Sequence, residues 1–305
     1  MNGKLNRLVN QFTQKYLDVL SELKGRGPRS YGFEYEFLPT RILSLDDMNA
    51  VNRLLPEIGF LLKGGVYQAE NGMRVAFEPG GQVEYCSPPL FVDDDRVLDS
   101  LLGLIDRTNT GIRKRLGIEY IGTDYMPGRA EVPLCLSADR YIKLHNRLAE
   151  VDTRGLEMMK GTASIHLHVL ISDIKEILPL FNLLCILSGM EDFKMSPERR
   201  DIWNHTDACR CGRPPCCFAQ LESSEELIKR LILFALHADV LGENIAFVNS
   251  TDQSFKTFLY HMTTLFTDVR FNLKGPTLEM RTMDSMPIEQ FKIKWNRFIE
   301  FFHNI

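Results

Sequence analysis

The sequence predicts an α+β fold, and two kinds of pattern lead to this prediction. Segments in which apolar and polar residues alternate, as they do in a strand, are interspersed with segments whose apolar residues recur at helical spacing. The chain contains no internal repeat, low-complexity tract or clear linker. Its length of 305 residues suits one large domain or two modest ones, and we expect residues 1–305 to form a single domain.

The helical segments are recognised by their periodicity and by their end signals. Residues such as Leu8 and Phe12 repeat on one face of a helix expected over about 4–24, which a Gly- and Pro-containing segment then ends. We expect Pro179 to interrupt the helix that contains it. Further helices are expected over about residues 93–115, 172–189, 223–240, 254–266 and 288–302, the last being a short C-terminal helix.

The extended segments alternate between apolar and polar residues. They are YGFEYEFLP at 31–39, VAFEPGGQVEYCSPP at 75–89, GTASIHLHVLI at 161–171 and VRFNLKGPTLEMRTMD at 269–284. We expect Gly80 and Gly81 to interrupt the second segment. Gly275 and Pro276 divide the fourth into two extended pieces.

Composition excludes several classes of protein. A net charge of −4 lacks the basic excess typical of nucleic-acid binders. The N-terminus lacks the features of a signal peptide, and no run of eighteen apolar residues predicts a membrane span. The seven cysteines are odd in number, and four of them crowd into residues 209–217, which is unlike a secreted disulfide framework. We therefore expect a cytoplasmic protein with no nucleic-acid or membrane partner.

Polar residues of one chemical kind gather on the extended segments. Successive side chains of a strand point to opposite faces, so the aromatic residues of 31–37 share a face and leave Glu34 and Glu36 on the other. The other segments repeat this arrangement. Their polar residues of matching parity are Glu78, Gln82 and Glu84, then Ser164, His166 and His168, and finally Glu279 and Arg281.

Each segment alone also fits a half-buried sheet with a solvated face, which is the more ordinary interpretation. Such a face, however, usually carries Lys, Thr, Ser and Gln, whereas this set consists mainly of Glu, His and Arg. Hard carboxylate oxygens suit Mg²⁺ or Mn²⁺, and a neutral imidazole can join them. An arginine beside the acids suits a phosphate or carboxylate. Together the segments predict a sheet face that holds divalent metal ions and a phosphate-bearing substrate.

Five blocks of sequence resemble the glutamate–cysteine ligase-like carboxylate–amine ligases, especially the plant and proteobacterial type. In order, between about residues 28 and 287, they are GFEYEF, FEPGGQVEYCSPP, GLEMMKGTASIHLHV, ERRDIWNHTDACRCG and HMTTLFTDVRFNLKGPTLEMRTMD. The resemblance implies a glutamine-synthetase-like fold, in which a curved, mainly antiparallel sheet forms a funnel with helices outside. It also implies an ATP- and Mg²⁺-dependent ligase that activates a carboxylate, such as the γ-carboxylate of glutamate, as an acyl phosphate and joins it to an amine or amino acid.

The resemblance also assigns roles to individual residues. The implied metal ligands are Glu34, Glu36, Glu84, His168 and Glu279. The residues implied to contact the nucleotide are Glu78, Gln82, His166, Arg210 and Arg281. Arg281, Arg210 and Glu279 would act in catalysis, and Arg199 and Trp203 would contact the amino-acid substrate. The H-x-H pair departs from the plant type, which has Q-x-N at this place and so differs at His166 and His168.

Two further departures concern the amine. The chain ends eighteen residues after Pro287, where longer members continue, so we expect parts of the pocket to be absent or supplied by a second copy or a partner subunit. The segment DACRCGRPPCCF also carries cysteines that the family pattern does not require. Both departures weaken the assignment of cysteine as the amine.

The cysteine-rich segment allows three interpretations. The residues Cys209, Cys211, Cys216 and Cys217 have the spacing C-x-C-x₄-C-C, which is irregular for a Zn²⁺ site. A redox-sensitive pair is the second interpretation, because nearby arginines favour thiolates. Ordinary reduced cysteines are the third and the simplest. The remaining residues Cys86, Cys135 and Cys185 lie in apolar settings and are expected in the core.

Two other functions compete with a ligase. A phosphotransferase of the same superfamily would stop at an acyl or guanidino phosphate. A non-catalytic nucleotide- or metal-binding protein would use the cysteine-rich segment as a sensor. The full set of acids and arginines favours the ligase, with small amino acids as its substrates.

Overall fold

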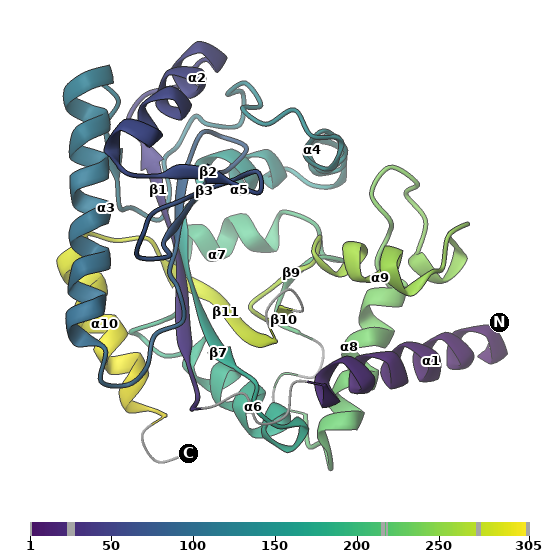
Figure 1. The fold of residues 1–305 in the computed structure, drawn as a ribbon. Helices are drawn as coiled ribbons and strands as arrows, with labels where there is room; N and C mark the ends of the chain where they lie inside the picture. Colours follow the sequence, from purple (N-terminus) through teal and green to yellow (C-terminus); the bar gives the residue numbers. More distant parts are fainter. Residues whose placement is uncertain (1, 23–27, 215–216, 218, 273–275, 303–305) are drawn as a thin grey trace.

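The computed structural model describes residues 2–22, 28–214, 217, 219–272 and 276–302. It confirms the α+β class, because helices alternate with strands of a mainly antiparallel sheet (Figure 1). None of the helices in these ranges is long and apolar enough to cross a lipid bilayer. The α-helices are α1 (Asn2–Ser21), α2 (Leu45–Leu54), α3 (Asp95–Leu116), α4 (Asp139–Val151), α5 (Gly155–Gly161), α6 (Ile177–Leu187), α7 (Pro197–Asn204), α8 (Ser224–His237), α9 (Phe255–Met262) and α10 (Ile288–Glu300).

Nine strands of the described residues form one open sheet in the order β10-β11-β7-β1-β5-β4-β3-β2, with β6 paired to the end of β1. Every neighbouring pair in it is antiparallel. The strands are β1 (Tyr31–Pro39), β2 (Leu61–Lys63), β3 (Val66–Gln68), β4 (Arg74–Phe77), β5 (Val83–Cys86), β6 (Tyr120–Ile121), β7 (Ser164–Leu170), β10 (Val269–Asn272) and β11 (Thr277–Asp284). Two short strands, β8 (Cys211–Gly212) and β9 (Phe266–Thr267), pair in parallel elsewhere.

The aromatic residues of β1 determine which face of this strand points toward the hydrophobic core. Phe33 and Tyr35 are at most 1 % exposed and pack against α10, where the ring of Phe33 lies 5.1 Å from Phe291 and 5.6 Å from Trp295. Burying a side chain of this size contributes about 1.5–3 kcal/mol. Helices α3 and α10 lie on this side of the sheet, and α4, α5 and α7 lie on the other (Figure 1). The polar face of β1 is therefore held toward the second group of helices.

The glycines at 80 and 81 interrupt the extended segment with a turn. β4 and β5 pair as a hairpin around them, and Gly81 has φ +87°, which favours glycine. A Cβ on Gly80 would lie 2.4 Å from the Lys160 carbonyl oxygen, so only glycine lets α5 approach this turn. The expected interruption at these glycines is confirmed, and it takes the form of a chain reversal between β4 and β5.

Two helix predictions also change. Pro179 does not interrupt its helix, because α6 begins at Ile177 and places the proline in its first turn, where no N–H is needed. A 3₁₀ turn at Ile174–Glu176, capped by Asp173, precedes it. The N-terminal helix reaches Ser21, and the end predicted near residue 24 lies outside the described residues.

Candidate active site

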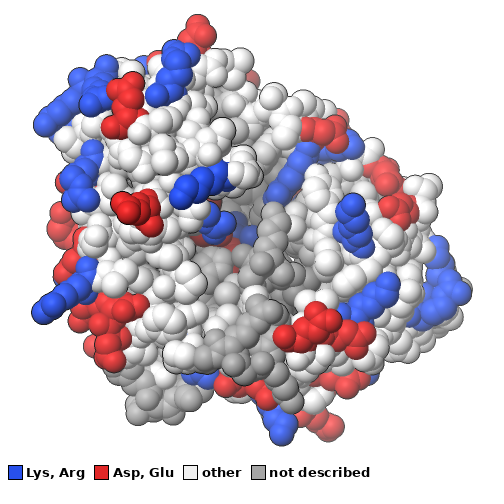
Figure 2. All heavy atoms as spheres, viewed as in Figure 1, with Lys and Arg blue, Asp and Glu red and all other residues white. Residues whose placement is uncertain are grey.

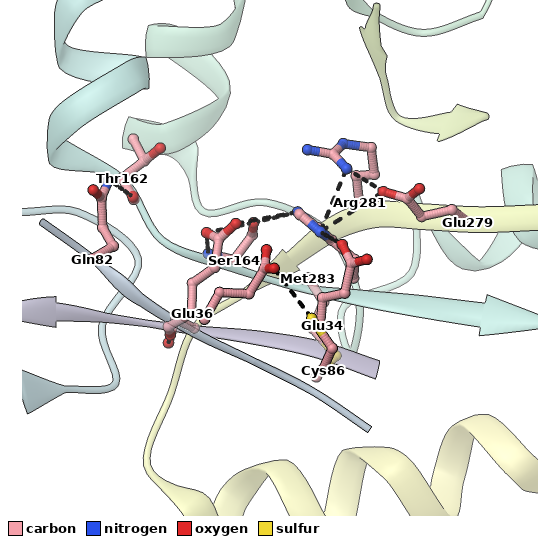
Figure 3. Close-up of polar contacts among 12 residues, drawn as sticks. Glu34, Glu36, Gln82, Cys86, Thr162, Ser164, Glu279, Arg281 and Met283 are labelled. Carbon is pink, nitrogen blue, oxygen red and sulfur yellow. Dashed lines mark hydrogen bonds and ion pairs between the residues drawn. The ribbon is translucent and has the colours of Figure 1, made fainter. Parts of the chain in front are cut away.

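Strands β1, β5 and β7 direct polar side chains from one face of the sheet (Figure 3). Glu34 lies opposite His166 in the strand register, and Glu36 lies opposite Glu84. Glu34 Oε2 is 2.8 Å from His166 Nδ1, and His166 Nε2 is 2.7 Å from Ser164 Oγ. The Ser164 N–H donates to Glu36 Oε2 at 2.7 Å. The shared polar face predicted from alternation is thus formed.

At the other side of β7, β11 adds an acid that two arginines neutralise. Glu279 is fully buried and lies opposite His168. Arg270 Nε donates to Glu279 Oε2 at 2.9 Å, and Arg281 donates to the other carboxylate oxygen. Burial alone would raise the pKa of Glu279, but the charges of Arg270 and Arg281 outweigh it and lower the pKa to about 2. This carboxylate is ionised and already paired.

The acids of β1 and β5 have no such guanidinium pair in the described residues. Burial, followed by the negative charge of Glu34, raises the pKa of Glu84 well above its usual value. Burial and the charge of Glu36 raise the pKa of Glu78 to about 8. Glu34 itself differs, because the charges and hydrogen bonds of its histidine neighbours overcome its burial and lower its pKa. The described structure thus crowds these carboxyl groups together, and the nearby charges of Arg140 and Arg281 only partly offset the raised pKa of Glu78.

Two cavities adjoin these acids, and Glu34 and Glu84 line both. Figure 2 shows a hollow in this face of the molecule with acidic and basic atoms inside it. The smaller cavity, about 270 Å³, is lined by polar groups that include Glu36, Glu78, Arg140, Tyr141, Trp203, Arg270 and Arg281. The larger cavity, about 550 Å³, is lined by His168 and Cys86 and by apolar residues such as Val66, Pro88, Pro89, Leu170 and Pro276.

Three groups of side chains in the described residues bring three potential metal ligands within 4.8 Å of one another. They are Glu34, His166 and Glu279; Glu34, Glu84 and Cys86; and Glu36, Glu84 and His166. Carboxylate oxygens predominate, and the raised pKa of Glu84 marks a place where a positive charge would relieve repulsion. The residues therefore fit a divalent cation. The described structure brings His166, which was predicted to contact the nucleotide, into two of these groups.

Of the two residues predicted to contact the amino acid, only Trp203 lines a cavity in the described structure. Arg199 is completely buried, and its guanidinium donates to the backbone carbonyls of Arg281, Thr282 and Met283. These residues form a β-bulge, because β11 advances three residues from Met280 to Met283 while β7 advances two. Arg199 therefore supports the bulge that carries Arg281, and its contact with a substrate stays a prediction.

Two residues predicted to contact the nucleotide are engaged within the protein. Arg210 is completely buried, donates to Asp207 and Thr264, and does not line either cavity in the described structure. Gln82 lines the smaller cavity, yet its amide donates to the Thr162 carbonyl at 3.0 Å and accepts from the Gly80 N–H at 2.8 Å (Figure 3). Both side chains therefore make their polar contacts within the protein.

Sequence reasoning missed several residues of the site. Arg140 and Tyr141 reach the smaller cavity from α4, a helix that the periodicity did not predict. Arg270 was not predicted to belong to the site, although its place opposite Glu279 follows from pairing the two extended pieces around Gly275. Cys86 was assigned to the core, but its thiol donates to Glu84 Oε1 at 3.2 Å. Its spacing of two residues from Glu84 was the signal that places it on the acidic face.

The cysteine-rich segment gains no metal site from the described residues. Cys216 lies outside them, and no metal-ligand group among them contains Cys209, Cys211 or Cys217. Burial raises the pKa of Cys211 to about 12 and also raises that of Cys209. A hydrogen bond with Cys185 lowers the pKa of Cys217. The first two therefore stay protonated thiols, and a zinc site there stays an unsupported prediction.

Comparison with known proteins supports the resemblance found in the motifs. No protein-family model matches the sequence. Curated homologues are "Glutamate–cysteine ligase, chloroplastic" of Solanum lycopersicum, 23% identical over 252 residues, and "Glutamate–cysteine ligase A, chloroplastic" of Oryza sativa subsp. indica, 25% identical over 248 residues. The Arabidopsis thaliana protein named "Glutamate–cysteine ligase, chloroplastic" is 23% identical over 252 residues.

Each match covers 70% of this chain and 46–48% of the relative. The chain thus spans about half the length of the curated relatives it matches. The predicted resemblance is confirmed: the homologues of this chain are glutamate–cysteine ligases.

Proposed function

We propose that this protein is an ATP- and Mg²⁺-dependent carboxylate–amine ligase that activates glutamate or a similar acid. The observation that carries the proposal is a layer of acids shared by two cavities, with Arg270 and Arg281 at its edge. A ligase of this class must hold two anions, the nucleotide and the acid, next to each other. The glutamate–cysteine ligase homologues support the same reaction class.

The two cavities differ in a way that suggests which substrate each takes. The smaller one presents Arg140, Arg281 and Tyr141, which suit the charged groups of an amino acid. Arg140 Nε is buried without a hydrogen-bond partner in the described structure, so a carboxylate would satisfy it. The larger cavity has more apolar walls, including Pro88 and Leu170, which suit a nucleoside. The γ-phosphate would then lie at the shared acids.

The proposed reaction has two steps. An oxygen of the substrate carboxylate attacks the γ-phosphorus of ATP, forming an acyl phosphate as ADP leaves. The amine nitrogen then attacks the carbonyl carbon, and phosphate leaves as the amine loses a proton. Arg281 and Arg270 stabilise the phosphoryl oxygens electrostatically, and burial of the site strengthens this interaction by excluding water.

The proposal extends to the cation and the fold. Glu34, Glu36, Glu84 and Glu279 would hold Mg²⁺ or Mn²⁺, which would neutralise charge between the two anions. We also propose that the open sheet corresponds to the funnel wall of a glutamine-synthetase-like fold, and that residues 1–305 act as one catalytic domain.

The test is ADP release from Mg-ATP with glutamate and a panel of amines that includes cysteine. We expect ADP release that depends on both substrates, with an amide detected by mass spectrometry. Arg281→Ala should lower kcat by about 10²–10³-fold, the usual range for removing one such donor. The exposed Glu225→Gln variant should match the wild type.

Three outcomes would contradict the proposal. An acyl phosphate or guanidino phosphate without an amide would indicate a phosphotransferase. ATP binding without turnover for every pairing would indicate a non-catalytic protein. Unchanged kcat in Arg281→Ala would show that the phosphoryl group is held elsewhere.

A further inference from the structure

The cations of the smaller cavity limit how many carboxylate groups it can bind. Three arginines line this cavity in the described structure, and two of them, Arg270 and Arg281, bind the carboxylate of Glu279. The third is Arg140. Its Nη2 donates to the Thr263 carbonyl oxygen at 3.0 Å, and its Nε is buried without a hydrogen-bond partner in the described structure. Arg140 can therefore bind one carboxylate group of a substrate.

A ligase that joins two amino acids would bring more carboxylate groups than these cations can bind. Under the proposed function, Arg270 and Arg281 bind the phosphoryl group, and Arg140 binds the α-carboxylate of glutamate. An amino acid as the amine would add a further carboxylate, and the described wall offers it no other arginine or lysine. The carboxyl groups already in this wall are those of Glu34, Glu36, Glu78 and Glu84. A buried ionised group without a partner is strongly disfavoured.

The wall of the smaller cavity also contains an apolar surface. It consists of Leu144, Met158, Met159, Trp203 and Phe266. The indole Nε1 of Trp203 donates to the Phe266 carbonyl oxygen at 3.1 Å, so the polar atom of this ring is satisfied within the protein. The guanidinium of Arg281 lies 5.9 Å from the ring centre of Phe266. An apolar group bound against Phe266 would therefore lie near the arginine assigned to the phosphoryl group.

We propose that the amine substrate is a short primary amine that carries no carboxylate group. The apolar surface contacts its carbon chain. The cavity of about 270 Å³ is smaller than the roughly 300–1,000 Å³ of typical ligand pockets, so only a short chain fits beside the acid. In the amide-forming step the amine nitrogen bonds to the carbonyl carbon, the carbon–oxygen bond to phosphate breaks, and the proton of the nitrogen passes to solvent. The inference rests on the proposed function and narrows it, because it names the class of the second substrate.

The experiment compares amino acids with their decarboxylated counterparts in the wild-type protein. Mg-ATP and glutamate are held constant, and the pairs are cysteine with cysteamine, alanine with ethylamine, and 2-aminobutyrate with propylamine. ADP release, with mass spectrometry of the amide, gives kcat/KM for each compound. The member without a carboxylate should be preferred in every pair by about tenfold or more, because its counterpart buries an unpaired charge.

Two variants separate the acid from the amine within the cavity. Arg140→Gln should raise the KM of glutamate by about tenfold or more, because it removes a charge-assisted hydrogen bond, and should leave the KM of ethylamine within about twofold. Met158→Ala should raise the KM of ethylamine by about tenfold and leave that of glutamate within about twofold. Its matched control is Met158→Leu, which conserves apolar volume and should stay close to the wild type.

The outcomes distinguish this inference from the proposed function. A preference for the amino acids, or a preference for the other members below about tenfold, would overturn the inference and leave a ligase in place. Equal rises in both KM values in each variant would also overturn it, because the acid and the amine would then share one subsite. An absence of ADP release with every pair would overturn the proposed function and this inference with it. If a variant does not fold, the comparison of pairs in the wild-type protein decides alone.

Discussion

The two sides of the acidic site carry similar side chains in opposite electrostatic states. Glu279 on β11 is paired with Arg270 and Arg281, and its pKa falls to about 2. Glu84 and Glu78, on and beside β5, lack such partners in the described structure, and their pKa values rise. On the first side the charge of the acid is balanced by side chains of the protein. On the second side the acids are crowded against one another, so the same residue type is ionised on one strand and has a raised pKa on another.

The largest expected effect comes from removing the paired acid. Glu279→Gln should lower the free energy of unfolding by about 3–5 kcal/mol, because it leaves the buried guanidinium of Arg281 and the partly buried guanidinium of Arg270 without their counter-charge. Urea unfolding measures this. The exposed Glu225→Gln variant, which loses only a surface ion pair with Lys229, should change stability by less than about 1 kcal/mol. Equal stability of the two variants would contradict the claim that Glu279 balances the charge of Arg270 and Arg281.

A smaller effect should come from adding Mg²⁺. Mg²⁺ at about 100 times its Kd should stabilise the folded protein by about 2.7 kcal/mol, because the unfolded chain does not assemble the ligands. Thermal unfolding with and without Mg²⁺ measures this difference. Glu84→Gln should lose most of the stabilisation, whereas Glu225→Gln should keep it. Full stabilisation of Glu84→Gln by Mg²⁺ would place the cation elsewhere.

Measured over a single pH unit, the smallest effect concerns pH in the metal-free protein. The pKa of Glu78 rises from 4.5 to about 8 on folding, so the folded state binds a proton that the unfolded state releases in this window. Stability should therefore fall as pH rises from 4.5 to 8, by at most about 1.4 kcal/mol per pH unit for this one proton. Urea unfolding of wild type and Glu78→Gln across the window should give a shallower slope for the variant. Identical slopes would mean that Glu78 is hydrated and ionised.

The sequence predicted the acidic face because strand alternation is a local property. The period of two placed Glu34, Glu36 and Glu279 on one side without knowledge of strand order. Strand alternation could not show that Arg140 joins them, because Arg140 lies on helix α4. The start of this helix is not marked by a side-chain hydrogen bond at its N-cap. It also could not distinguish Trp203, which lines the cavity, from Arg199, which is buried behind it. Those roles depend on how α7 packs against β11.

Short and exposed elements escaped prediction for a different reason. All three residues of β2 are exposed, so the strand has no apolar face to reveal its period. Cys86 was misplaced for the opposite reason. Its apolar residue type suggested a core position, although its strand position, two residues from Glu84, puts both side chains on the same face. Parity was the more reliable guide there, since it reflects backbone geometry rather than average preference.

The bulge in β11 makes the spacing of this strand sensitive to insertion and deletion. It lets Met280 and Met283, three residues apart, both enter the core, while Arg281 between them reaches the cavity. Removing one residue here would restore a regular ladder and put the segment after Arg281 out of phase with the segment before it. The carbonyls that Arg199 now binds would then turn toward β7. Length variation should therefore be excluded within the strand.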